Sequence, residues 1–175
     1  YEMKFKSINA TTVERYEWLI SQYFRFPEVH FCCLVIDKHR YPIPTGMDYF
    51  DAYMHQLSML IRNNVGDAEF VVLPDDITVP NGKEYEGTFM SHLSRYSKNC
   101  FGVHRLESHS NLFLQMVDVL IGAVVYDFKG VEHEQKARVS QKIAAKLGRS
   151  TLAEKFTVSA PAAPNYFSVW PYERK

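Results

Sequence analysis

Asp118 is the acidic residue of this 175-residue chain best placed to do chemistry, because it stands in an otherwise apolar segment. The segment NLFLQMVDVLIGAVVY, residues 111–126, predicts a helix that is apolar nearly all round and therefore buried on most sides. A carboxylate in that setting must bind a metal ion, pair with a partner or shift its pKa, because a bare buried charge is very costly. A structural role, in which Asp118 anchors a neighbouring loop through hydrogen bonds, explains this segment equally well.

Two further residues extend the helical face that carries Asp118. Gln115 precedes it by three positions and Gly122 follows it by four, and residues at these spacings are neighbours on a helix surface. Glycine costs about 1 kcal/mol against alanine inside a helix. Gly122 therefore indicates that another part of the chain approaches this helix closely.

Other acids stand where apolar runs end. Asp37 closes HFCCLVID, and Asp75 and Asp76 follow FVVLP. In open α/β sheets functional groups gather beyond the carboxyl ends of the strands, where carboxylates from adjacent strands can hold Mg²⁺ or Mn²⁺. Two such ions would clamp the oxygens of a phosphodiester. For each aspartate alone, closing a turn is the more ordinary role.

The elements that must position these residues follow from periodicity. Apolar or alternating runs predict strands over residues 1–8, 30–36, 70–73, 102–106 and 165–170. Helical spacing predicts helices over residues 12–25, 50–63, 85–96, 111–126 and 132–147. Strands that alternate with helices favour a βαβ-type sheet, so the chain is expected to form one α/β domain over residues 1–175.

Composition limits the class of protein and its partners. Hydrophobic residues make up 46% and charged residues 23%, which is typical of a globular domain. Twenty basic and twenty acidic residues cancel, so contact with nucleic acid would have to come from a local patch. One candidate patch combines basic and aromatic residues: Arg95, Tyr96, Lys98, Phe101 and Arg105. The more ordinary interpretation of these residues is a solvent-exposed face.

The remaining signals favour a cytoplasmic protein. Cys32, Cys33 and Cys100 show no metal-binding spacing and are expected to be reduced, buried thiols. No apolar run reaches the length of a membrane span, and the first residues lack the pattern of a signal peptide. The sequence also lacks the P-loop, dinucleotide-binding, zincin and hydrolase motifs, so those enzyme classes lose support.

The stretch LESHSNLFLQMVDVLIGAV resembles the C-terminal hallmark of a large bacterial and phage family, the domain of unknown function thirty-eight hundred. That hallmark is a serine followed by Leu-Gln-x-x-Asp and a helix rich in small residues. It maps onto Ser108, Leu114, Gln115, Asp118 and Gly122.

Other segments resemble the family in the same order. YEMKFKSI matches a Glu-x-Lys-[Trp/Phe]-x-Lys segment at Glu2, Lys4 and Phe5. HFCCLVIDK, FVVLPDD and NYFSVWPYERK are similar to its central, next and closing strands, so the resemblance spans essentially the whole chain. His109 departs from the family, which commonly has lysine there. The family's first strand, which bears an Asp-Glu pair, has no counterpart, and we expect the natural chain to begin before Tyr1.

The resemblance implies a ribonuclease-H-like fold, a mixed sheet flanked by helices, and a divalent-metal-dependent nuclease that uses Mg²⁺ or Mn²⁺. Asp118, Glu2 and Asp37 would bind metal together with the first-strand aspartate, and Asp75 is the alternative to Asp37. Gln115 and Ser108 would orient the metal ligands or a substrate phosphate through hydrogen bonds. Lys4 would neutralise the charge of the phosphate.

Two other functions remain open. The same fold could serve as a non-catalytic module that binds nucleic acid or protein in a phage or defence system. That alternative predicts acids that lie far apart or pair with arginine and lysine. A structural assembly protein is the third hypothesis, and its 14% aromatic content would then form an exposed apolar face.

Overall fold

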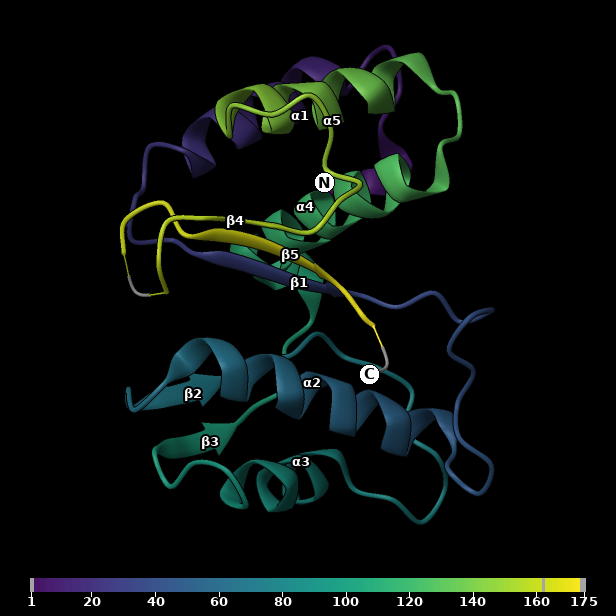
Figure 1. Cartoon of the computed structure of the whole chain (residues 1–175), viewed down its shortest axis with the longest axis vertical. Helices are drawn as coiled ribbons and strands as arrows, with labels where there is room; N and C mark the ends of the chain where they lie inside the picture. The colour runs from purple at the N-terminus through teal and green to yellow at the C-terminus, as the bar shows by residue number, and fades with distance from the viewer. Residues whose placement is uncertain (1, 162, 174–175) are drawn as a thin grey trace. The chain divides into compact units, whose positions relative to one another are not determined.

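A computed structural model describes residues 2–161 and 163–173, and it shows a mixed α/β protein (Figure 1). The chain divides into two compact units. Unit 1 contains residues 2–35 and 111–173, and unit 2 contains residues 36–110. Each unit has its own hydrophobic core.

Unit 1 has a three-stranded sheet in the order β1-β5-β4. Strand β5 (Phe167–Pro171) runs parallel to β1 (Phe31–Val35) and antiparallel to β4 (Phe156–Val158). Its helices are α1 (Val13–Tyr23), α4 (Leu112–Lys129) and α5 (Glu134–Lys146), preceded by a one-turn 3₁₀ helix, η1 (Phe5–Ser7). Helices α1 and α5 pack side by side, and α4 contacts both α5 and β1 (Figure 1).

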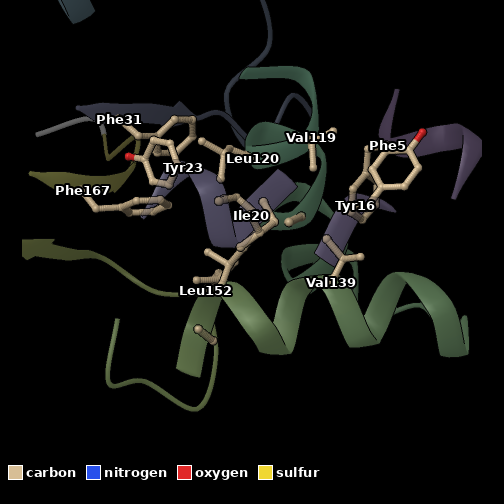
Figure 2. Close-up of a cluster of buried hydrophobic side chains, with 14 of the residues drawn as sticks. Phe5, Tyr16, Ile20, Tyr23, Phe31, Val119, Leu120, Val139, Leu152 and Phe167 are labelled. Carbon is tan, nitrogen blue, oxygen red and sulfur yellow. The ribbon is translucent and has the colours of Figure 1, made fainter. Parts of the chain in front are cut away.

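The core of unit 1 joins its helices to its sheet. Figure 2 shows that side chains from α1, α4, α5 and the two parallel strands meet in one cluster. Tyr16 and Ile20 of α1 are fully buried there, as is Val119 of α4. Each Å² of apolar surface removed from water stabilises the folded state by about 25 cal/mol. This cluster is therefore the main source of the stability of unit 1.

Unit 2 is built around one βαβ arrangement. Strands β2 (Phe70–Val72) and β3 (Cys100–Val103) are parallel, and α3 (Tyr85–Ser94) connects them and packs on β3. Helix α2 (Tyr49–Val65) packs against α3. A second one-turn 3₁₀ helix, η2 (Ser108–Ser110), follows.

Most of the predicted elements are present, and two details differ. The strand predicted over residues 1–8 is wrong, because the chain forms η1 at Phe5–Ser7. Strand β4 was not predicted. Asn111 caps α4 by accepting hydrogen bonds from the N–H groups of Phe113 and Leu114.

Candidate functional site

The face of α4 that carries Gln115 and Asp118 binds the backbone of the N-terminal segment. The N–H of Phe5 donates to Asp118 Oδ1 at 2.8 Å, across 113 residues of sequence. The N–H of Met3 donates to Gln115 Oε1 at 2.9 Å. Alternate N–H groups of an extended chain point to the same side, so two helix side chains act here as the partner that a neighbouring strand would provide.

Tyr16 of α1 binds the backbone of Lys4, the residue between Met3 and Phe5. Its hydroxyl accepts from the Lys4 N–H at 3.2 Å and donates to the Lys4 carbonyl oxygen at 2.8 Å. The Lys4 backbone is extended, with φ −125° and ψ 140°. Main-chain groups of residues 3–5 are therefore held by side chains of α1 and α4, and we call this arrangement the N-terminal clamp: Met3, Lys4, Phe5, Tyr16, Gln115 and Asp118.

Gly122 completes the clamp by contact. A Cβ atom at this position would lie 2.3 Å from both Cβ and Cγ of Phe5, which is closer than atoms can approach. The Phe5 ring is buried in the core of unit 1 and lies near Tyr126. The expectation of a close approach at Gly122 is confirmed.

The clamp gathers residues that the sequence marks as candidates at opposite ends of the chain. Glu2 and Lys4 flank Met3, and their side chains form an ion pair at 3.1 Å. Asp118 is exposed, and α4 also exposes Phe113 and Val117, so the expectation that this helix is buried on most sides and holds a buried carboxylate is wrong. Gln115 is buried. One oxygen of Asp118 takes the Phe5 N–H, and no hydrogen bond to its second oxygen is formed within residues 2–161 and 163–173.

The other candidate acids belong to unit 2 and close turns there. Asp37 Oδ1 accepts from the N–H groups of His39 and Arg40, at 2.9 and 3.3 Å. Asp75 Oδ1 accepts from the N–H of the next residue, Asp76, at 3.0 Å. These are the capping roles that aspartates after strands commonly have.

Asp76 and Ser108 complete the candidates of unit 2. Asp76 pairs with Arg105 at 3.2 Å, and the same guanidinium binds Glu86 at 2.8 Å. Arg105 is therefore neutralised, which removes it from the predicted basic patch. Ser108 begins η2.

The carboxylate oxygens of the candidate residues are ligands of the chemical type that a hard divalent cation prefers, but unit 1 offers few of them. Mg²⁺ is commonly held by one or two carboxylates, with water and substrate phosphate completing its shell. Asp118 lies on α4 beside the clamped segment, and Glu2 is the carboxylate of that segment, where it pairs with Lys4. Within the described part of the chain, no three His, Cys, Asp or Glu side chains are arranged to hold a metal ion.

Sequence reasoning missed two residues with structural consequences. Helical spacing predicts only that Tyr16 belongs to the helix of residues 12–25, and nothing in that spacing reveals that its hydroxyl binds a backbone twelve residues away. Asp127 of α4 accepts from Ser140 of α5 and from the Leu152 N–H, which ties the end of α4 to the segment after α5. A carboxylate near the end of a helix gives no signal for such a role.

The fold defines a mixed α/β protein, and comparisons with known proteins add no closer assignment. No family model, no curated protein and no solved structure matches the chain. None of the helices in the described ranges has both the length and the apolar character needed to cross a membrane.

Proposed function

We propose that this chain is a ribonuclease-H-like protein that hydrolyses phosphodiester bonds with Mg²⁺ or Mn²⁺, and that Asp118 is its central acid. The observation that carries the proposal is the N-terminal clamp. It holds the backbone of Met3 and Phe5 against Gln115 and Asp118 of α4, more than a hundred residues away in sequence, and Glu2 and Lys4 are the neighbours of Met3 in that segment. The resemblance assigns these same residues to metal and phosphate.

The clamp gives each residue a chemical task. The Phe5 N–H holds one oxygen of Asp118, which orients the carboxylate as groups beside metal ligands usually do. Gln115 fixes Met3, and through it the neighbouring Glu2, while Lys4 supplies a positive charge for a phosphate oxygen. Asp118 and Glu2 would hold the metal ion, which when bound supplies Lewis-acid polarisation of a phosphoryl oxygen.

A second candidate function is a non-catalytic module that binds nucleic acid or protein. Glu2 pairs with Lys4, and the unit 2 acids Asp37 and Asp75 cap turns. The Glu2–Lys4 pair is the pairing with a basic residue that this alternative predicts, whereas Asp37 and Asp75 accept hydrogen bonds from backbone N–H groups. Binding of nucleic acid is compatible with both functions, so metal-dependent cleavage is what distinguishes them.

The test is a cleavage assay of the full chain with Mn²⁺ on single- and double-stranded DNA and RNA. Asp118→Asn is the informative variant, because an amide oxygen still accepts the Phe5 N–H and the clamp should survive. The matched control is Asp67→Asn, which neutralises an exposed acid of unit 2. Circular dichroism melting of each variant separates loss of fold from loss of chemistry.

We expect metal-dependent cleavage by wild type and Asp67→Asn, and none by Asp118→Asn at an unchanged melting temperature. Equal cleavage by wild type and Asp118→Asn would remove Asp118 from the mechanism. Wild type that cleaves none of the four substrates, but binds one of them, would favour the non-catalytic function.

A further inference from the structure

The turn that follows β1 presents three basic side chains in succession. Lys38, His39 and Arg40 are all exposed. Asp37 holds the turn by accepting from the N–H groups of His39 and Arg40, and the Tyr41 N–H donates to the Asp37 carbonyl oxygen at 2.8 Å. These three side chains therefore stand on a backbone fixed by three hydrogen bonds.

Lys38 and Arg40 differ from Lys83 and Arg105, which are both paired with acids. Lys83 binds Asp48 and Asp51, both at 2.7 Å, and Arg105 binds Asp76 and Glu86. By contrast, neither Lys38 nor Arg40 forms an ion pair with any acid in the described ranges. Their positive charge is left to attract an anion from solution.

Two aromatic rings lie beside these cations. The Lys38 ammonium stands 4.9 Å from the centre of the Tyr49 ring, and the Arg40 guanidinium stands 5.4 Å from the centre of the Tyr41 ring. Tyr49 is 61% exposed, so a face or an edge of its ring is accessible to a flat ligand. We call this surface the basic turn: Lys38, His39, Arg40, Tyr41 and Tyr49.

We propose that the basic turn binds single-stranded nucleic acid, with its cations on the phosphates and Tyr49 stacked on a base. Cations combined with exposed aromatic rings are the usual means of binding single strands, because every base has a face on which a ring can stack. A lone phosphate or a lipid headgroup would contact the basic side chains but would not stack on the Tyr49 ring. This inference rests on the proposed function in one respect, which is that the bound single-stranded nucleic acid would be the substrate for cleavage. Binding itself requires no catalysis.

The experiment measures binding of the full chain to fluorescein-labelled (dT)20 by fluorescence anisotropy, in EDTA so that metal-dependent cleavage cannot occur. The variants are Lys38→Ala/Arg40→Ala, which removes two charges, and Tyr49→Leu, which removes the ring at constant charge. Lys146→Ala/Lys155→Ala is the matched control, because it removes two exposed charges from unit 1. Tripolyphosphate as competitor and phosphatidylcholine/phosphatidylserine vesicles (3:1) test the other anion sources.

We expect Lys38→Ala/Arg40→Ala to weaken binding about tenfold and to lower the slope of log Kd on log salt by about 1.4, since each phosphate contact on a single strand contributes about 0.7. Tyr49→Leu should weaken binding roughly fivefold, in the range typical of a lost stacking contact. The control variant should bind like wild type.

Three results would overturn the proposal. One is wild type that fails to bind (dT)20 at low salt, and another is a double variant that binds as well as its control. The third is Tyr49→Leu binding like wild type while tripolyphosphate or the vesicles compete as well as unlabelled (dT)20, which would show an anion site without base recognition. Because no step depends on cleavage, a failed nuclease assay would leave a positive binding result intact.

Discussion

Phe5 lies directly on Gly122, so closely that the smallest side chain at position 122 would overlap its Cβ and Cγ atoms. The contact joins η1 to the middle of α4 within unit 1. The same two elements are linked by the hydrogen bond from the Phe5 N–H to Asp118. Packing and hydrogen bonding therefore fix the N-terminal segment at one place on α4.

Gly122→Ala should destabilise the protein although alanine is the better helix former. The gain in helix propensity is about 1 kcal/mol, and overpacking against Phe5 costs about 1–3 kcal/mol, so we expect a net loss of up to about 2 kcal/mol in the free energy of unfolding. Urea denaturation measures it. Phe5→Ala, which removes Cγ and the ring, should reduce the cost of Gly122→Ala in the double variant. A more stable Gly122→Ala would show that the contact is loose.

Tyr16→Phe tests the other side of the clamp. The variant keeps the buried ring and removes only the hydroxyl, which leaves the N–H and the carbonyl of Lys4 without this partner. Losing a hydrogen bond to a poorly solvated group costs about 1–3 kcal/mol, so the melting temperature should fall by several degrees. Tyr96→Phe, at a half-exposed tyrosine of unit 2, is the control and should melt like wild type. Equal melting of both variants would contradict the clamp.

Asp127→Ala should be among the more damaging substitutions of an acid in unit 1. The Asp127 carboxylate accepts from the hydroxyls of Ser140 and Thr151 and from the Leu152 N–H. Three hydrogen bonds at about 1 kcal/mol each predict a loss of about 2–4 kcal/mol in the free energy of unfolding. Chemical denaturation of Asp127→Ala and of Asp127→Asn, which keeps one oxygen acceptor, should show the smaller loss for asparagine. Wild-type stability in the alanine variant would mean that the three donors find other partners.

Stability should decline at alkaline pH because of two thiols of unit 1, of which Cys33 is buried and Cys32 is half-buried. Burial raises the pKa of Cys32 to about 11, and burial together with the charge of Cys32 raises the pKa of Cys33 to about 12. In the unfolded chain a thiol loses its proton at about pH 8.5. The unfolded state therefore binds fewer protons than the folded state above this pH, so the stabilisation is complete below about pH 8.5 and is lost as pH rises toward 11 and 12.

Urea denaturation at pH 7.5, 9 and 10 measures this decline. The slope of unfolding free energy against pH should be shallower in Cys32→Ala/Cys33→Ala than in wild type, whatever the absolute stability of the variant. Burial and the Cys32 charge also raise the pKa of Tyr23, which should leave part of the slope in place. A double variant with the wild-type slope would show that other groups cause the decline.

The sequence by itself determined the type and order of most elements, because periodicity is a local property. The apolar run at residues 30–36 became β1, the βαβ arrangement of unit 2 was expected, and the spacing of Gln115, Asp118 and Gly122 correctly placed them on one face of α4. Gly122 inside the predicted helix also indicated a close contact, although the sequence did not identify Phe5 as the partner.

Only the tertiary structure decided what that face binds. Alternating residues at 1–8 predict a strand, yet residues 3–5 bind side chains of Tyr16, Gln115 and Asp118 and then turn into η1. The pattern of a segment reports which of its sides is buried, and it does not report whether its N–H groups meet another strand or the side chains of helices. The partners of Asp118 lie more than a hundred residues away in sequence, so they are brought to it only when the core of unit 1 closes around Phe5.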